Sequence, residues 1–572
     1  MSQKNIDVSP PIEKSVATAV TAQQQVPVRV VALCGVGILL CILVSVSPIF
    51  HLAGKTFLLS LRTNRFLLAW GSWLPYDLHL AQPQRASMIA TNSIEFLVLI
   101  ALSFGVYALC AVFIQRQLAD SHFTNITRII WLVAIVGGLI YVLTPAMLSR
   151  DIFVYVGYGR TIALHHANPY FVAPAAFPKD PLTSYDDWQF ATAAYGPFWL
   201  AICSIMALVP GNSPLRYLIA FRLLSFASYL FNIWLVTLIL QKMGRSPRTV
   251  TLGTLLYAWN PLVIEESCLG GHNDTIMVSL LLLGIWFSLR AEQQNFARPA
   301  RYLLPIIAFT LATLVKITAL PLIALFLVLL VRRAMLSFAS TPSLRLEYIR
   351  SLNWKAALQK VILAGIVSGL IAAICYAPFW LGHSTHDIMQ SFSAPPSARY
   401  SENSIMRAVH EWINAHGSPA QPSWVYTALN FFNQRIVWDR ISYIFVAGTT
   451  IIGAIWLWLV PTTRTMVLAA LLSLGALLLI TPWFFAWYGI WLVALAVICL
   501  PTSIDRLGRA LIALALTFSA SAFVTYVAAV GGWSILNWLA MTTPPILAFL
   551  VFLIWKNTTH VHLLADADAI TM

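Results

Sequence analysis

Long, nearly uninterrupted apolar runs occur along the whole chain. The first covers residues 28–50, and others follow at short intervals. A bilayer core is crossed by about 20 apolar residues in a helix, so runs of this kind predict membrane-spanning helices. The further runs cover residues 93–115, 129–147, 195–210, 217–240, 249–264, 275–289, 303–331, 361–381, 441–460, 465–481, 487–500, 510–530 and 538–555. The pattern predicts an all-α polytopic membrane protein with about 13–14 membrane helices, some of them broken or re-entrant.

The two chain ends are polar, and the first apolar run is expected to be retained. That run is too long for the core of a signal peptide, and no small-residue cleavage site follows it. The predicted organisation is a disordered cytoplasmic tail (1–27), three N-terminal membrane helices (28–147), an extracytoplasmic loop (148–194), core membrane helices (195–381), a second extracytoplasmic loop (382–440), C-terminal membrane helices (441–556) and a cytoplasmic tail (557–572).

Lys and Arg in the short loops predict the orientation, because cytoplasmic loops carry an excess of them. The basic loops are 115–128, 241–248, 290–302, 332–360 and 501–509. With these loops in the cytoplasm, residues 195–240 must cross an odd number of times although they hold two apolar runs. Residues 303–331 must likewise return to their starting side. Backbone breaks are therefore predicted around residues 210–214 and near Lys316 and Pro321, and such breaks at membrane depth are tolerated where they are buried or line a cavity.

The composition excludes a soluble protein and a nucleic-acid reader. Hydrophobic residues make up 59% of the chain and charged residues 10%, whereas soluble domains average about 25% charged residues. The net charge is +14, but the basic residues lie between apolar runs and form no patch or tail. The seven cysteines lie almost all inside apolar runs and bracket no hydrophilic domain, so a disulfide framework is not expected.

Acidic residues at the outer ends of the spans are candidates for chemistry, because partial desolvation raises a carboxylate pKa and suits it to proton transfer. The first such segment begins at Asp151 and continues through Tyr155, Tyr158 and Arg160 to Asn168-Pro169-Tyr170. It places a carboxylate, a guanidinium and aromatic rings on one short interfacial helix. The alternative is a simple interfacial anchor, since Tyr and Arg are common at headgroup depth.

A second segment, Gly270-Gly271-His272-Asn273-Asp274, follows Glu265 and Glu266 at the outer start of a span. Helix capping alone would account for Asp274. His272 with the carboxylates resembles a divalent-metal ligand set, but the ligand spacing is loose, and neither a metal nor another cofactor is predicted.

Lys316 lies far from both ends of its apolar run. Inserting such a lysine costs roughly 2.5–3.5 kcal/mol, so it is expected to face a cavity or an anionic partner. The alternative is a lysine that reaches the interface from a short half-helix. The aromatic run Trp483–Tyr488 fits an interfacial belt as well as a carbohydrate platform.

In this order, the segments resemble the polytopic GT-C class of glycosyltransferases, which use a polyprenyl-phosphate sugar as donor. Within the class, they look most like bacterial polyprenol-phosphate-mannose-dependent α-(1→6)-mannosyltransferases, which build the mannan cores of lipoglycans. The resemblance covers roughly residues 130–500. It rests on Ser149-Arg150-Asp151 through Tyr155, Gly159-Arg160, Asn168-Pro169-Tyr170, Tyr195-Gly196-Pro197, Gly271-His272-Asn273-Asp274, Lys316 and the run from Trp483 to Tyr488.

The resemblance implies that Asp151 is the catalytic base of an inverting mannosyl transfer on the extracytoplasmic face of the bacterial plasma membrane. The class usually places this carboxylate after the first span, whereas Asp151 follows the third, so Asp77 is the rival candidate. Arg160, Lys316 and either Arg399 or Arg407 are the candidates that stabilise the departing phosphate. The remaining predicted substrate-binding residues are Tyr155, Asn168, Tyr170, Tyr195, His272, Asn273, Asp274, Trp483 and Tyr488.

The expected partners are a polyprenyl-phosphate sugar donor, a glycan or lipoglycan acceptor and the lipid bilayer. The competing hypothesis is a transporter or flippase of a lipid-linked sugar, which predicts ionisable residues near the midplane and two related halves. Lys316 fits that hypothesis, but the sequence shows no internal repeat. A catalytically inactive membrane scaffold is the third possibility, and it leaves the segment from Asp151 to Arg160 unexplained.

Overall fold

The computed structural model describes residues 12–52, 86–116, 123–144, 146–336, 353–391, 400–416, 423–500, 506–526 and 534–555. Within these ranges the chain is helical, and the sole β-pairing is an isolated bridge between Glu402 and Trp483. Among the described residues, eleven helices are long and apolar enough to cross a membrane, and three shorter apolar helices accompany them. The all-α polytopic class predicted from the apolar runs is confirmed.

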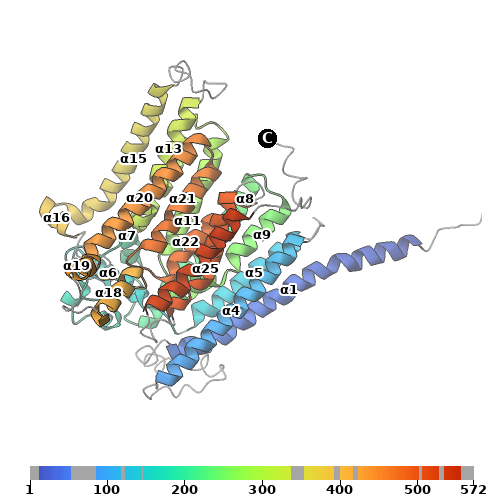
Figure 1. Cartoon of the computed structure of the whole chain (residues 1–572), viewed down its shortest axis with the longest axis horizontal. Helices are drawn as coiled ribbons and strands as arrows, with labels where there is room; N and C mark the ends of the chain where they lie inside the picture. Colours follow the sequence, from blue (N-terminus) through green and yellow to red (C-terminus); the bar gives the residue numbers. More distant parts are fainter. Residues whose placement is uncertain are drawn as a thin grey trace, which may run out of the picture.

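Three N-terminal helices lie side by side along one flank of the bundle (Figure 1). They are α1 (Ile12–Leu52), α4 (Ala86–Arg116) and α5 (Phe123–Leu143). α1 begins at Ile12, within the segment that the polar composition predicts as a disordered tail. The Trp259 indole joins this flank to the rest of the bundle, because its Nε1 donates a 3.0 Å hydrogen bond to the carbonyl of Ile130.

The remaining long helices form the body of the bundle. They are α8 (Pro214–Lys242), α9 (Pro247–Ala258), α11 (Asp274–Glu292), α12 (Pro299–Val315), α13 (Leu320–Leu336), α15 (Trp354–Trp380), α20 (Arg435–Leu459), α21 (Thr463–Ile480), α22 (Gly489–Val497), α23 (Arg506–Ser521) and α25 (Ser534–Ile554). Short connecting turns are α10 (Pro261–Ile264), the π-helical turn η4 (Glu265–Gly270), η5 (Ile317–Ala319) and η6 (Ala486–Tyr488).

The two apolar runs within residues 195–240 form one short helix and one spanning helix. α7 (Pro197–Met206) has 10 residues, which is about 15 Å of helix against a hydrocarbon core about 30 Å thick. The chain then turns before Pro214, and α8 continues for 29 residues. Of these two helices, α8 alone is a candidate membrane span, which agrees with the single crossing expected from the basic loops.

The run 303–331 forms a helical hairpin broken at Lys316. α12 ends at Val315, Lys316 is extended with φ −150° and ψ 124°, and α13 begins at Leu320. Arg333, near the end of α13, pairs at 2.5 Å with Glu292, the last residue of α11. Because α12 follows α11 after a short loop, both ends of the hairpin lie at the same end of the bundle. The predicted break is therefore present, and it lies at the opposite end from Arg333.

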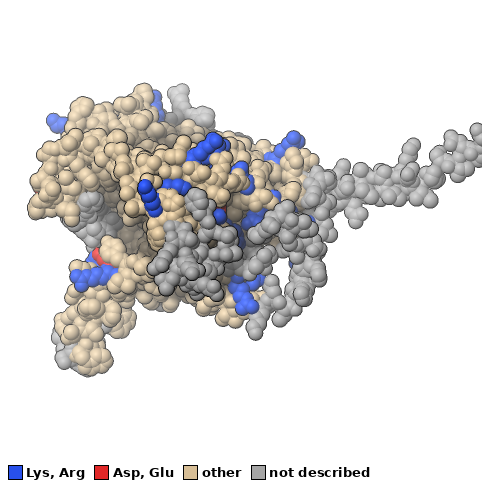
Figure 2. Space-filling view, turned by 90° about the horizontal axis from the view of Figure 1, so that it is seen from above, with Lys and Arg blue, Asp and Glu red and all other residues tan. Residues whose placement is uncertain are grey.

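Basic side chains gather at one end of the bundle. Figure 2, which views the molecule from above, shows many Lys and Arg side chains and very few Asp or Glu on this face. The last turns of α8, α11 and α13 supply Lys242, Arg290 and Arg333. Short helices occupy the other end, at the lower left of Figure 1. They are α6 (Asp151–Ala163), η2 (Pro174–Ala176), η3 (Thr183–Tyr185), α16 (Thr385–Ser391), α18 (Ile405–His416) and α19 (Ser423–Phe432).

Candidate active site

Asp151 is the first residue of α6 and lies at the edge of a pocket. Its side chain is 18% exposed, and its backbone N–H donates a 3.3 Å hydrogen bond to the Ser149 hydroxyl. Burial raises the pKa of Asp151, while the charge of Lys316 opposes that rise. The result is a carboxylate that reaches the pocket and accepts a proton more readily than an exposed aspartate.

His272 lies directly behind Asp151, on a loop shaped by two glycines. A Cβ atom on Gly270 would lie 2.5 Å from His272 Cδ2, and Gly271 has a left-handed φ of +65°. The imidazole ring is buried and stacks on Trp487 with ring centroids 3.9 Å apart. Its Nδ1 lies 3.7 Å from Asp151 Oδ2, and its Nε2 lies 3.4 Å from Glu266 Oε2. The glycine pair thus lets the His272 ring fold back over its own turn.

Lys316 and Asp274 form an ion pair at the break between α12 and α13. Lys316 Nζ lies 2.8 Å from Asp274 Oδ1, which also accepts a 2.7 Å hydrogen bond from Trp491 Nε1. The ammonium group lies 3.9 Å from the centre of the Tyr488 ring. The Lys316 side chain is 14% exposed, so one side of this cation remains open to the pocket. The sequence analysis expected Lys316 to face a cavity or an anionic partner, and in the structure it contacts Asp274 and lines the pocket.

The pocket has a volume of about 480 Å³, which is within the usual range for small-molecule sites. Asp151 and Lys316 both line it, together with aromatic side chains. The ion pair between Arg435 and Asp439, 2.8 Å apart on α20, also lines it. The residues predicted from sequence that line the pocket are Asp151, Tyr195, Lys316, Trp483 and Tyr488.

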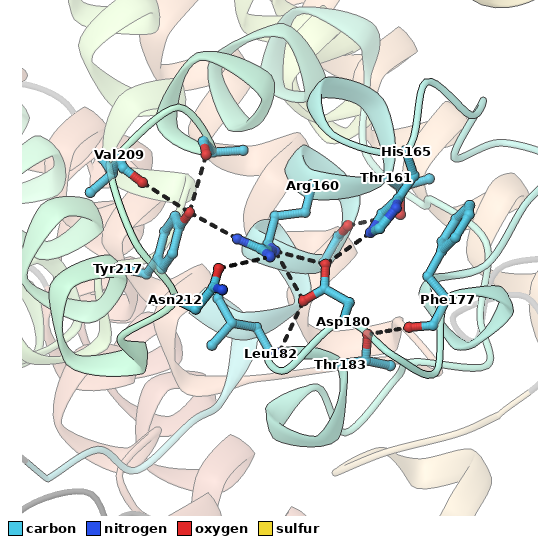
Figure 3. A network of polar contacts seen from close by, with 12 residues as sticks. Arg160, Thr161, His165, Phe177, Asp180, Leu182, Thr183, Val209, Asn212 and Tyr217 are labelled. Carbon is cyan, nitrogen blue, oxygen red and sulfur yellow. Dashed lines mark hydrogen bonds and ion pairs between the residues drawn. The ribbon is translucent and has the colours of Figure 1, made fainter.

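Arg160 lies in a separate polar network and does not line this pocket. Its Nε donates to both carboxylate oxygens of Asp180, at 3.1 and 2.8 Å, and its other nitrogens donate to Tyr217 and Asn212 (Figure 3). Burial alone would raise the pKa of Asp180, but hydrogen bonds from Arg160, the Leu182 backbone and His165 hold it below its usual value. Arg160 therefore fixes the loop after α6 to the start of α8.

Other predicted residues also make structural contacts. Asn168 donates to the Phe379 carbonyl at 2.5 Å, and the Tyr170 hydroxyl donates to the Tyr195 carbonyl at 2.8 Å. Arg407 is paired with Glu402 at 2.5 Å and with Glu411 at 2.9 Å.

Tyr155 is buried beside the site and donates a 3.4 Å hydrogen bond to the side-chain oxygen of Asn273. Asp77 and Arg399 lie outside the described residues.

Three features of the site were not singled out by the sequence analysis. Glu266 was noted as a neighbour of the second segment, but its contact with His272 was not foreseen. Trp491, which anchors Asp274, is one of many tryptophans in the chain. Arg222 is fully buried in α8 and donates to the carbonyls of Tyr141, Thr144, Ala146 and Leu269. A lone arginine inside an apolar run was the available signal for Arg222, as it was for Lys316.

The Arg222 hydrogen bonds join the end of α5 to η4. The carbonyls that it binds precede Asp151 on one side and His272 on the other. This single guanidinium therefore fixes the two segments that meet at the site.

In the part of the chain that the structure describes, no three His, Cys, Asp or Glu side chains are placed to hold a metal ion. Asp151 and Lys316 line one pocket, and the His272 imidazole lies behind Asp151.

The fold and the site together define a multi-pass membrane protein with a pocket, lined by Asp151 and Lys316, at one end of its helix bundle. The family model for the N-terminal domain of α-(1→6)-mannopyranosyltransferases matches residues 63–333. The resemblance drawn from the sequence motifs is thereby confirmed over that segment, which contains Asp151, His272, Asp274 and Lys316.

Curated relatives carry the same name. α-(1→6)-Mannopyranosyltransferase A of Mycobacterium tuberculosis is 27% identical over 194 residues, 34% of this chain and 34% of the relative. The enzyme of that name from Corynebacterium glutamicum is 28% identical over 160 residues, 28% of this chain and 31% of the relative. The chain thus spans about a third of the length of the curated relatives it matches.

Among solved structures, the oligosaccharyltransferase AglB of Archaeoglobus fulgidus, in complex with an inhibitory peptide and a dolichol-phosphate, matches with a TM-score of 0.34. The identity is 14%, over 70% of this chain and 52% of that chain.

Proposed function

We propose that this protein is a glycosyltransferase that transfers mannose from a polyprenyl-phosphate donor to a glycan or lipid-linked glycan on the extracytoplasmic side of the bacterial plasma membrane. The observation that carries the proposal is that Asp151 and Lys316 line one pocket. A base and a cation facing the same space are what glycosyl transfer from a phosphate requires. The α-(1→6)-mannopyranosyltransferase relatives support mannose as the sugar.

In the proposed reaction, an acceptor hydroxyl gives its proton to Asp151 as its oxygen bonds to the anomeric carbon. The bond from that carbon to the phosphate oxygen breaks, and the electron pair leaves with the phosphate. Lys316 stabilises the developing negative charge from the exposed side of its ammonium group. Attack opposite the leaving group inverts the anomeric centre, so a β-linked phosphosugar gives an α-mannoside.

The pocket walls suit this substrate. Trp188, Trp483 and Tyr488 line it, and flat aromatic faces cover the apolar faces of sugar rings. Trp188 and Trp483 contact each other edge to face, 5.6 Å between ring centroids. Ile317, Leu320 and Pro321 line the pocket beside Lys316, and this apolar edge is the proposed entry for the lipid end of the donor.

The test uses membranes that contain the protein, a radiolabelled polyprenyl-phosphate mannose and a short α-mannoside acceptor. The wild type is expected to form a labelled α-mannoside, and Asp151→Asn is expected to lose at least about 10²-fold in rate, because general-base catalysis contributes about 10²–10⁴-fold. Asp187→Asn is the matched control. Asp187 is 55% exposed and pairs with Arg150 outside the pocket, so this variant should transfer mannose at nearly the wild-type rate.

Full activity of Asp151→Asn would remove Asp151 as the base and make Asp77 the candidate to test. A wild type that moves lipid-linked mannose across vesicle membranes but forms no glycoside would overturn the proposal in favour of a flippase. If neither product forms with mannose while another polyprenyl-phosphate sugar is transferred, the reaction class stands and the sugar is wrong.

A further inference from the structure

Two fully buried side chains behind Asp151 have no role in the reaction described above. His272 and Glu266 both have 0% of their side-chain surface exposed. Neither ring nitrogen of His272 has a hydrogen-bond partner, and the same holds for Glu266 Oε2. Buried polar atoms without partners are uncommon in folded proteins, and each one calls for an explanation.

The geometry arranges these groups in a line. Asp151 Oδ2 lies 3.7 Å from His272 Nδ1, and on the other side of the ring His272 Nε2 lies 3.4 Å from Glu266 Oε2. Glu266 Oε1 accepts a 2.6 Å hydrogen bond from the Tyr526 hydroxyl. Trp487 stacks on the imidazole at 3.9 Å with an interplanar angle of 13°. The ring is thus held flat, with one nitrogen toward each carboxylate.

We propose that Asp151, His272 and Glu266 form a proton relay that removes the acceptor's proton from the pocket into the protein; this inference rests on the proposed function. The acceptor hydroxyl proton passes to Asp151. Asp151 then gives a proton to His272 Nδ1 while the Nε2 proton moves to Glu266. The imidazole begins and ends neutral, one carboxylate is regenerated and the other is protonated.

The relay has a physical purpose in this site. While donor and acceptor fill the pocket, water has little access to Asp151, and a proton left there could return to the departing phosphate or the acceptor oxygen. The two contacts of His272, at 3.7 and 3.4 Å, are longer than most hydrogen bonds. Catalytic hydrogen bonds are often long before substrate binds and shorten in the reacting complex.

Charged and titratable groups from several elements surround the relay. Among them are Asp274 on α11, Lys316 at the break before α13, and Tyr526 at the end of the helical segment that follows Arg506. Asp186, Tyr155, Tyr195 and Tyr488 also lie close enough to interact with Asp151. Lys316 is paired with Asp274 at 2.8 Å, so it neutralises a carboxylate outside the relay. This arrangement leaves Glu266 as the acceptor within reach of His272 Nε2.

The test is the single-turnover rate of mannosyl transfer by the full-length protein in mixtures of H2O and D2O. The variants are His272→Gln and Glu266→Gln, and the second preserves the shape of the side chain. Both are expected to transfer mannose about 10–100-fold more slowly, with the KM for the donor within about twofold of wild type. The wild type should show a curved dependence of rate on deuterium fraction, because two protons move, and each variant should show a straight line.

Ser225→Ala is the matched control, because the Ser225 hydroxyl donates to the His272 carbonyl at 3.5 Å and takes no part in the relay. It should keep the wild-type rate and the curved dependence. An active wild type whose two variants keep its rate and its curve would overturn the relay and leave the proposed function intact. Slow variants that retain the curved dependence would show that His272 and Glu266 only support the structure. A wild type that transfers no mannose would instead overturn the proposed function and the relay with it.

Discussion

Burial shifts the pKa of Asp186, a carboxyl group close to the candidate site. It is 1% exposed, its Oδ1 accepts a 2.7 Å hydrogen bond from the Trp188 backbone, and its Oδ2 has no hydrogen-bond partner. Burial raises the pKa of Asp186 to about 7, and the nearby charges of Asp151 and Asp187 add to the rise. Because Trp188 lines the pocket, the protonation of Asp186 bears on one wall of the candidate site.

We predict that Asp186 makes the protein less stable as the pH rises from about 4 to about 7. Below this range the carboxyl is protonated in both the folded and the unfolded chain. Within it, the unfolded chain releases the proton while the fold retains it, so the free energy of unfolding falls with pH. The difference between a pKa near 7 in the folded chain and about 3.9 in the unfolded chain corresponds to a loss of about 4 kcal/mol in the free energy of unfolding. The loss is complete once the pH exceeds the folded-state pKa.

Asp186→Asn removes this titration while its side-chain oxygen can still accept from Trp188. The variant should therefore gain thermal stability over the wild type at pH 8 and gain much less at pH 5, measured as Tm in detergent. Asp187→Asn, on the exposed neighbour, should show no such pH dependence. An equal difference between Asp186→Asn and wild type at both pH values would contradict the prediction.

The sequence could identify individual residues of the candidate site but could not assign their partners. Asp151, His272, Asp274 and Lys316 stand out as polar residues at span ends or inside an apolar run, and the structure brings them together. Arg160 carries the same kind of signal, yet Asp180 neutralises it. Asp180 is 20 residues away along the chain and belongs to no motif, so only the folded loop reveals the pairing. Glu266 was missed as a functional group for the same reason.

At the scale of elements, close contact between α7 and α12 positions Lys316. A Cβ atom on Gly196 would lie 2.1 Å from the Leu314 carbonyl oxygen, and the Gly196 N–H donates to the Val315 carbonyl at 3.2 Å. Residue 196 thus contacts the last turn of α12, immediately before Lys316. The Tyr195-Gly196-Pro197 motif is explained by this approach, since Pro197 is the first residue of α7 and Tyr195 lines the pocket.

Gly196→Ala is predicted to separate α7 from α12 and to displace Lys316. Overpacking of this kind costs about 1–3 kcal/mol, so the Tm should fall. The rate of mannosyl transfer should fall with it, because the cation moves relative to Asp151. Gly369→Ala on α15 is the control, since no atom of the described residues lies within 4 Å of its added Cβ. It should lower neither quantity, because alanine is favoured over glycine inside a helix. A Gly196→Ala protein with wild-type Tm and rate would show that the contact does not hold Lys316.

The helix breaks could be predicted from the sequence because the predicted orientation fixes whether each segment crosses the membrane an odd or an even number of times. Basic loops at both ends of residues 303–331 require the chain to return, and Lys316 with Pro321 marks where it turns. The same count requires one of the two runs within residues 195–240 to be broken or re-entrant, but it does not say which one. The run 195–210 is apolar enough for a span, but its helix ends at Met206 before the turn that precedes Pro214. Apolarity alone cannot distinguish a buried half-helix from a spanning one, because both are enclosed by nonpolar neighbours.

At the scale of the whole molecule, the two ends of the bundle differ in charge. One end holds Arg290, Arg332 and Arg333 in the last turns of α11 and α13, and Figure 2 shows this kind of basic surface. The other end holds the pocket with Asp151, and Asp274 begins α11 there. Because cytoplasmic loops are enriched in Lys and Arg, the pocket is expected to open on the extracytoplasmic side.

A cysteine-labelling experiment tests this orientation. Phe190 is 82% exposed in the loop after α6, and Gln294 is exposed in the loop between α11 and α12. Phe190→Cys should react with a membrane-impermeant maleimide in intact cells, whereas Gln294→Cys should react only after the cells are permeabilised. The seven native cysteines are buried or half-buried, so the background should be low. The reverse pattern would place the pocket in the cytoplasm and contradict a reaction on the extracytoplasmic face, even if Asp151 proved to be the base.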